Sequence, residues 1–220
     1  GEKTVIHLFT ATVTALMQPR IRRQVARLDG LIKDLEGHVR LRLAESMDLS
    51  NTAGLSQALD SHRDSDLSLS ELSASLDPDH KAQPVDPEWL RWVTQLLEKL
   101  RHLRWQYTEG QTNQGRANMG FINATGCSSV WGSTFPYNPY PFPWANHLFQ
   151  DSPSIALGVF QGHMAKMAEG FKAVRQAELE LAGNYKPGEH DEFFTYFDWK
   201  KFSDDEWLLC PPVVAVGGDG

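Results

Sequence analysis

A cysteine among small residues is the first candidate for chemistry in this 220-residue sequence. Cys127 lies in the stretch NATGCSSVWG, and Cys210 is the only other cysteine. A cysteine in such a setting can be a small buried hydrophobe, a nucleophile or a metal ligand. No histidine has a spacing that requires contact with Cys127, and an iron–sulfur cluster needs about four thiolates. The local residues favour a buried structural cysteine, although the small neighbours also fit a bulky cofactor that approaches the backbone.

A carboxylate on a glycine turn is the second candidate. Residues 213–216 (VVAV) predict a buried strand, and the sequence GGDG, which contains Asp219, follows it directly. Ligands of open α/β sheets bind where parallel strands end. Glycines there let backbone amides approach a phosphate, and a carboxylate can hold a divalent cation. A plain strand-to-turn transition with Asp219 in solvent explains these four residues equally well.

Three helical segments are predicted to position these candidates. Apolar residues recur at helical spacing over residues 4–43, and Pro19 predicts a kink or a break between two helices there. The stretch VDPEWLRWVTQLLEKLRHLRWQY predicts a helix that Asp86 caps and Pro87 starts. A third helix, with methionines and small residues on its buried side, is predicted over residues 154–182.

The rest of the chain predicts strands and loops. The run MGFINATG, residues 119–126, predicts a buried strand that leads into the loop of Cys127. Prolines in residues 133–151 exclude long regular structure, because proline lacks a backbone donor. Residues 46–87 are rich in serine and aspartate, which predicts an exposed insertion or a mobile loop.

Composition excludes several classes of protein. With 41% hydrophobic and 22% charged residues the chain is typical of soluble globular proteins. The net charge of −7 and a pI of about 5.6 argue against a nucleic-acid partner. No apolar run reaches about 18 residues, so no membrane span is predicted. Two cysteines without a leader or a disulfide framework predict a cytoplasmic location. The absent initiator methionine and the closing glycine turn predict a piece of a longer polypeptide.

Several motifs together carry a resemblance. The stretch FINATGCSSVWGS, the proline-rich loop, PWANHLFQDS, the methionine-containing helix and the final GGDG stand in one order. In type and order they resemble the C-terminal thiamine diphosphate domain of the pyruvate:ferredoxin (flavodoxin) oxidoreductase family. The opening Gly-Glu resembles the end of that family's Cys-x-x-Cys-Gly-Glu motif.

The resemblance implies an α/β fold class. Its expected form is part of a thiamine diphosphate-binding fold, a parallel sheet flanked by helices, with a large and mostly helical insertion. Residues 1–19 would start the domain, and residues 20–115 would form the insertion, with a flexible stretch at 46–87. Residues 116–220 would hold the thiamine diphosphate and iron–sulfur part of the same domain, truncated at the GDG motif.

The resemblance also implies roles for single residues. Cys127 would be a ligand of a 4Fe-4S cluster and lie close to thiamine diphosphate, which Glu2 would contact. Asp219, with Gly218 and Gly220, would bind Mg²⁺ and the diphosphate.

Other residues receive smaller roles, and no residue of this chain is predicted to be catalytic. Asn123, Thr125, Ser128 and Ser129 are predicted donors in the cofactor loop, whereas Trp131, Trp144 and Phe149 are predicted to pack the loops. Cys210 is predicted to be structural. By the same resemblance, the remaining cluster and diphosphate ligands would lie outside the chain, and the fragment alone would be inactive.

The implied reaction is the oxidative decarboxylation of pyruvate or another 2-oxoacid with coenzyme A to acetyl-CoA and CO₂. Electrons would pass through iron–sulfur clusters to ferredoxin or flavodoxin, and the full-length protein would be a cytoplasmic homodimer. Two alternatives stay open. One is a cluster-free thiamine diphosphate decarboxylase or synthase, in which Cys127 is idle. The other is a non-catalytic scaffold module on a degenerate thiamine domain, which docks a partner through Trp89, Trp92 and Trp105.

Overall fold

The structure is a computed structural model that describes residues 1–46, 85–124, 126, 137, 140, 142–147 and 152–217. The serine-rich stretch predicted to be flexible lies mostly outside these ranges. In chain order the elements are α1 (Glu2–Ser46), α4 (Pro87–Thr108), β1 (Gly120–Ala124), β2 (Trp144–His147), α6 (Ser152–Leu181), α7 (Pro187–Thr195), the 3-10 helix η1 (Trp199–Lys201), α8 (Asp204–Trp207) and β3 (Val213–Val216). The described chain is mostly helical with a small parallel sheet, which is compatible with the predicted α/β class.

The sheet has the strand order β2-β1-β3, and β1 is parallel to both neighbours. Asn123 of β1 stands opposite Asn146 of β2 on one side and Val216 of β3 on the other. Every residue of β1 is buried because strands flank it on both sides. The prediction that residues 213–216 form a buried strand is wrong in part: β3 is only half-buried and its Ala215 is exposed, because β3 is an outer strand of the described sheet.

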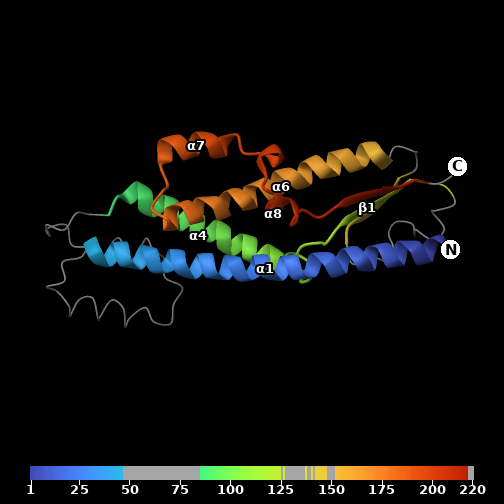
Figure 1. Ribbon diagram of the computed structural model, residues 1–220, viewed down its shortest axis with the longest axis horizontal. Helices are drawn as coiled ribbons and strands as arrows, with labels where there is room; N and C mark the ends of the chain where they lie inside the picture. Colours follow the sequence, from blue (N-terminus) through green and yellow to red (C-terminus); the bar gives the residue numbers. More distant parts are fainter. Residues whose placement is uncertain are drawn as a thin grey trace.

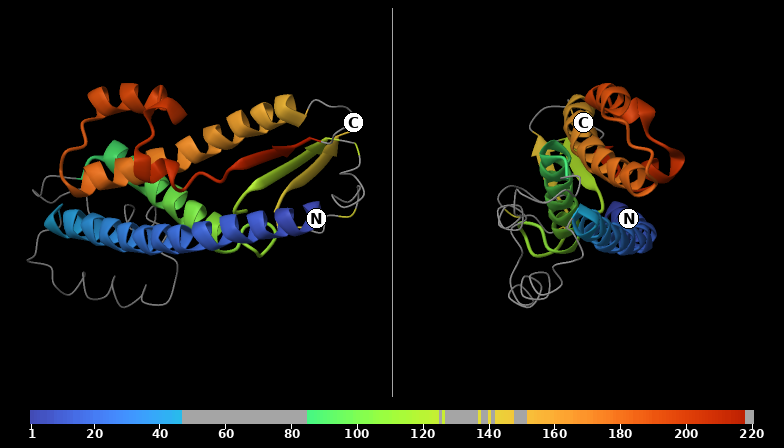
Figure 2. Two further views of the ribbon diagram at one scale, coloured as in Figure 1. Left: turned by 45° about the vertical axis from the view of Figure 1, so that its right-hand side comes forward. Right: turned by 90° about the vertical axis from the view of Figure 1, so that its left-hand side faces the viewer.

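Helices cover the two faces of the sheet (Figure 1). On one face, Ile6 and Val13 of α1 pack against a cluster that includes Phe121 and Met119. On the other, α6 contacts β1 and β3. The turned views show the same order, with the strands between the blue helix α1 and the orange helix α6 (Figure 2). The sheet is thus a middle layer.

Helices α1, α4 and α6 form a second, purely helical core away from the sheet. The predicted helix over residues 86–107 is confirmed as α4, and the Asp86 side chain caps it by accepting a hydrogen bond from the Glu88 backbone N–H at 2.9 Å. Side chains from the three helices share one apolar cluster: Leu28, Leu31, Leu35, Val39, Leu43, Val93, Leu96, Leu97, Leu100, Leu103, Tyr107, Ala173, Val174 and Ala177.

A buried carboxylate joins these three helices. Glu180 of α6, whose side chain is 9% exposed, accepts a hydrogen bond from the Trp89 Nε1–H of α4 at 2.7 Å. His38 Nε2 and Arg42 Nη1 of α1 lie 3.3 and 3.4 Å from the same Glu180 oxygen. The Arg42 guanidinium also stacks over the Trp89 ring, 4.4 Å from its centroid. One acidic side chain therefore links all three helices.

Pro19 is predicted to cause a kink or a break, and the break is wrong, because α1 runs through that residue as one helix of 45 residues. An interior proline removes one backbone hydrogen bond and costs about 3 kcal/mol. Here α1 packs on both sides of Pro19, with Val13 against the sheet and Leu28 in the helical core. Packing on both sides keeps the helix continuous, since most helix stability in proteins comes from tertiary contacts.

Helical spacing places Val5, Leu8, Phe9, Val13 and Leu16 on one face of α1, but of these only Val13 packs against the sheet. Val5, Leu8 and Leu16 are 63%, 64% and 56% exposed, although they share one helical face in the sequence. The sheet instead covers the side of α1 that carries Ile6 and Val13. The sequence pattern therefore predicts the helix correctly but does not determine which face of the helix is buried.

The segment after α6 folds back onto that helix. The predicted helix over residues 154–182 is confirmed, and Met164, Met167 and Phe171 of its buried side contact Phe194 of α7 and Phe202. The Ser203 side chain and Glu206 form a reciprocal cap at the start of α8. No helix in the described part of the chain is long and apolar enough to cross a membrane.

Candidate functional site

Most of the predicted site residues lie outside the residues that the structure describes. This applies to Cys127, Gly218, Asp219 and Gly220, and to the side chain of Glu2, whose backbone starts α1. Thr125, Ser128, Ser129, Trp131 and Phe149 also lie outside. Their predicted roles remain predictions, and the structure instead describes the elements from which these segments start.

The strands that lead into the Cys127 loop and the GGDG motif end at the same edge of the sheet. The loop of Cys127 follows β1, and the GGDG motif follows β3, its hydrogen-bonded parallel neighbour. Parallel strands end at the same edge, so the two motifs begin next to one another although about 90 residues separate them. In Figure 1 the N label, at the start of α1, also lies at this end. We call it the carboxyl edge.

Helix α1 runs antiparallel to the strands and begins at the carboxyl edge (Figure 1). The first backbone N–H groups of a helix have no partner within the helix, and the helix dipole places partial positive charge there. In α1 the Thr4 and Val5 N–H groups bond to the Gly1 carbonyl at 3.0 and 3.3 Å. The carboxyl edge therefore combines strand ends with a helix start, which suits an anionic group.

Two amide side chains connect β1 and β2 near this edge. The Asn123 Nδ2–H donates to Asn146 Oδ1 at 3.1 Å, and the Asn123 side chain is completely buried. The Asn123 Oδ1 atom is buried and has no hydrogen-bond partner among the described residues. The buried indole Nε1–H of Trp144, two residues before Asn146, has no partner there either. A buried acceptor and a buried donor thus remain unpaired on neighbouring strands.

Sequence reasoning missed part of this arrangement. Asn123 is predicted as a cofactor-loop donor, yet the atom it leaves unpaired is an acceptor. Trp144 is predicted to pack a loop, and its ring does pack beside Phe121, but its N–H is unpaired. Asn146 was not singled out, because the prolines before it hid the strand β2. The stretch WANH does not alternate between apolar and polar residues, so no local signal in it predicts the strand.

Cys210 has the properties of a structural residue. Its thiol is half-buried and donates to the Glu206 carbonyl oxygen at 3.4 Å. Burial raises the pKa of Cys210 to about 12, and the nearby Arg116 only partly opposes this shift. The thiol is therefore protonated at neutral pH, which supports the predicted structural role.

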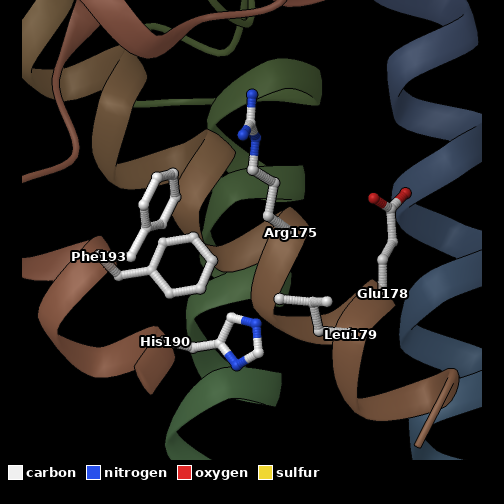
Figure 3. Close-up of a pocket in the computed structure, with 6 residues that line it drawn as sticks. Arg175, Glu178, Leu179, His190 and Phe193 are labelled. Carbon is white, nitrogen blue, oxygen red and sulfur yellow. The ribbon is translucent and has the colours of Figure 1, made fainter. Parts of the chain in front are cut away.

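A pocket elsewhere in the molecule does not compete with the carboxyl edge. It has a volume of about 360 Å³ and lies between α6 and α7, where Arg175, Glu178, Leu179, His190, Phe193 and Phe194 line it (Figure 3). Both charged side chains from α6 are already paired. Arg175 makes a bidentate contact with Glu206, with both N···O distances 2.7 Å, and Glu178 bonds to Arg27 of α1. Neither is left to recognise a charged ligand.

No cluster of three or more metal-ligating side chains occurs within the described ranges. The predicted metal ligands, Cys127 and Asp219, are not in those ranges. The predicted magnesium and iron–sulfur sites therefore stay predictions.

Comparisons with known proteins test the resemblance. No family model matches the chain, and no solved structure matches it. A segment is 44% identical over 54 residues to pyruvate-flavodoxin oxidoreductase of Klebsiella pneumoniae, which covers 21% of this chain and 5% of that protein. Pyruvate dehydrogenase [NADP(+)] of Cryptosporidium parvum is 40% identical over 73 residues, or 30% of this chain and 3% of that protein. The chain fits a fragment of this family.

A third relative agrees. Pyruvate-flavodoxin oxidoreductase of Enterobacter agglomerans is 43% identical over 51 residues, which is 20% of this chain and 4% of the relative. The predicted resemblance to the pyruvate:ferredoxin (flavodoxin) oxidoreductase family is confirmed at this level. The matched segments span at most 5% of each relative's own length.

Proposed function

We propose that this chain is part of an oxidoreductase that decarboxylates pyruvate, or another 2-oxoacid, with coenzyme A to give acetyl-CoA and CO₂. Two electrons would leave through iron–sulfur clusters to ferredoxin or flavodoxin. The names of the relatives support the oxidoreductase class and pyruvate as the substrate. The proposal includes the thiamine diphosphate fold, with the insertion at residues 20–115, although the boundary at 19 and 20 falls inside α1. A cytoplasmic homodimer belongs to the same proposal.

The meeting of three chain segments at the carboxyl edge carries the proposal. The segments of Cys127 and Asp219 start from paired strands, and Glu2 starts the helix beside them. The edge fits a polar, anionic cofactor on two counts. Backbone N–H groups at the start of α1 suit phosphate oxygens. The unpaired Asn123 Oδ1 beside the edge, and the Trp144 Nε1–H at the start of β2, suit a ligand that forms hydrogen bonds.

The residues of this chain would bind and orient the cofactors. Thiamine diphosphate, when bound, supplies the electron sink that decarboxylation requires. Asp219 would hold the Mg²⁺ that neutralises the diphosphate, while Gly218 and Gly220 let backbone N–H groups approach the phosphate oxygens. Cys127 would hold one iron of the 4Fe-4S cluster through its thiolate, and Glu2 would contact the thiamine cofactor.

Anaerobic reconstitution of the full-length polypeptide that contains this segment tests the cluster. Cys127→Ala should lose the visible absorption of the iron–sulfur cluster that Cys127 binds. Cys210→Ala is the matched control, because it removes the other thiol of this chain, and it should keep that absorption. Equal spectra for the two variants would refute the cluster assignment and leave the cluster-free decarboxylase or synthase as the better reading.

Titration with thiamine diphosphate and Mg²⁺ tests the cofactor site. Asp219→Asn should weaken magnesium-dependent binding at least about 10-fold, because a neutral amide is a poorer ligand for a hard cation. The control Asp205→Asn changes an exposed carboxylate on α8 and should bind as the wild type does. Wild-type protein that shows no magnesium-dependent binding would support the scaffold alternative instead.

A further inference from the structure

Two unpaired polar atoms lie in an apolar setting on neighbouring strands. Asn123 Oδ1 is next to the end of β1 at the carboxyl edge, whereas Trp144 starts β2, two residues further from that edge. Strand side chains alternate between the faces of a sheet, so Asn123 shares a face with Phe121. Phe121 packs against Ile6 and Val13, which makes this the face that α1 covers. Trp144 stands opposite Phe121 in the register and belongs to the same apolar cluster. Asn123 Oδ1 and Trp144 Nε1 are therefore on one side of the sheet.

Such unpaired atoms are costly unless something else binds them. More than about 90% of buried polar groups in proteins have a hydrogen-bond partner. Asn123 is completely buried in the central strand β1. An apolar residue at this position would avoid the cost of an unpaired acceptor. The Nδ2–H of Asn123 is held by Asn146, which fixes the plane of the amide and the direction of Oδ1. Residues that violate such packing rules are most often found at functional sites.

We infer that Asn123 Oδ1 and Trp144 Nε1–H bind an uncharged polar group of a ligand that enters from the carboxyl edge, with Asn123 accepting one hydrogen bond and Trp144, further from the edge, donating another. The inference rests on the proposed function. The surrounding side chains, among them Met119 and Val216, are apolar, so a bare charge would lose its hydration without compensation there. The contact therefore goes to the uncharged, nitrogen-containing part of the cofactor and not to its diphosphate.

Asn146 has a positioning role in this arrangement. It stands opposite Asn123 in the register and accepts the Nδ2–H hydrogen bond at 3.1 Å. This bond decides which way the Asn123 amide faces, because the two ends of an amide differ only in their hydrogen bonding.

The chain offers a matched control at Gln24. This residue lies in the middle of α1, is 4% exposed, and also has a buried side-chain atom, Nε2, without a partner in the described part of the chain. It belongs to neither a strand nor the carboxyl edge. Gln24→Leu and Asn123→Leu each remove one unpaired buried side-chain atom, but only Asn123→Leu removes the proposed ligand contact.

The test uses the full-length polypeptide and two probes, thiamine diphosphate and inorganic pyrophosphate, each with Mg²⁺. Asn123→Leu should raise the Kd for thiamine diphosphate at least about 10-fold and leave the Kd for pyrophosphate unchanged. Asn123→Leu removes the unpaired Oδ1 and also the Nδ2–H that bonds to Asn146, so the unfolding temperature without ligand is measured in parallel to separate lost stability from lost binding. Gln24→Leu should leave both Kd values unchanged.

Trp144→Phe is the second variant, because it keeps an aromatic ring in the cluster and removes the N–H. It should raise the Kd for thiamine diphosphate about 3- to 10-fold with no change for pyrophosphate, and it keeps the inference testable if Asn123→Leu does not fold.

Several results would overturn the inference. Unchanged thiamine diphosphate binding in both variants would do so, as would a lower unfolding temperature of ligand-free Asn123→Leu with unchanged binding, which indicates a structural role. Equal loss of pyrophosphate binding would place the contact on the diphosphate instead. Wild-type protein that binds neither probe would refute the proposed function and this inference together. Wild-type binding of both probes with unaffected variants would refute this inference alone.

Discussion

The hydrogen bond from Trp89 to Glu180 should contribute strongly to the stability of the helical core. It joins a buried carboxylate to an indole N–H at 2.7 Å, and the carboxylate side chain is only 9% exposed. Trp89→Phe removes the donor and keeps an aromatic ring. Glu180 would then keep only two longer contacts, from His38 and from Arg42, whose side chain is 48% exposed and well hydrated.

The expected magnitude follows from this geometry. Hydrogen bonds to charged groups contribute about 1.5–3 kcal/mol. The smaller ring also loses packing, so the reference is Trp92→Phe on the same helix. Trp92 stacks on Tyr185 with ring centroids 4.4 Å apart. Trp89→Phe should therefore lower the free energy of unfolding by about 1.5–3 kcal/mol more than Trp92→Phe does.

Thermal unfolding of the 220-residue chain, followed by circular dichroism, measures this difference. In a domain of this size each kcal/mol shifts Tm by about 2–4 °C, so Trp89→Phe should melt about 3–12 °C below Trp92→Phe. A Glu180→Leu background completes a double-mutant cycle, in which the effect of Trp89→Phe should shrink because the acceptor is gone. Equal Tm values for Trp89→Phe and Trp92→Phe would refute the reasoning.

Four further predictions concern the rest of the described chain. Gly115 has a φ of +72°, and an added Cβ would overlap a backbone carbonyl of α4, so Gly115→Ala should cost about 2 kcal/mol or more in chemical denaturation. Gly30→Ala, with open space around its Cβ on α1, should instead stabilise by about 0.5–1 kcal/mol, and a loss of stability there would contradict the fold. In Cys127→Ser protein, Cys210, with its pKa raised to about 12, should react slowly with iodoacetamide at pH 8; rapid labelling would show an exposed thiol. The pKa of Tyr185 is raised to about 12, mainly by burial and secondly by the carboxylate to which its hydroxyl bonds. The protonated Tyr185 hydroxyl therefore stabilises the fold below pH 10, and this contribution to the free energy of unfolding is lost as pH rises toward 12. Tyr185→Phe should flatten that decline, and an unchanged slope between pH 9 and 11 would contradict it.

The sequence predicted the elements whose local signals are strong. Asp86 and Pro87 predict the start of α4, and the Asp86 cap is confirmed. The apolar run that begins at Met119 predicts a buried strand, and β1 is buried throughout. A short apolar run between polar loops is typical of a buried strand. The methionine-bearing face of α6 also packs as expected.

Other features depend on partners that a single segment does not reveal. Pro19 signals a break locally, but contacts before and after it keep α1 continuous. The stripe of Val5, Leu8 and Leu16 shares one helical face with spacing typical of a core, yet the sheet packs against the adjacent face. Strand β2 follows a proline-rich stretch and forms only because β1 offers it a parallel partner.

The sequence by itself determined which chemical groups are available: a cysteine among small residues, a carboxylate among glycines, and the motifs on which the family resemblance rests. Tertiary structure decided where those motifs start. Cys127 and Asp219 are far apart in sequence, and only the parallel pairing of β1 with β3 brings the ends of their strands to one edge. It also left Asn123 Oδ1 buried and unpaired among the described residues. The physical reason is that pairing and burial depend on contacts between distant segments, which no local pattern encodes.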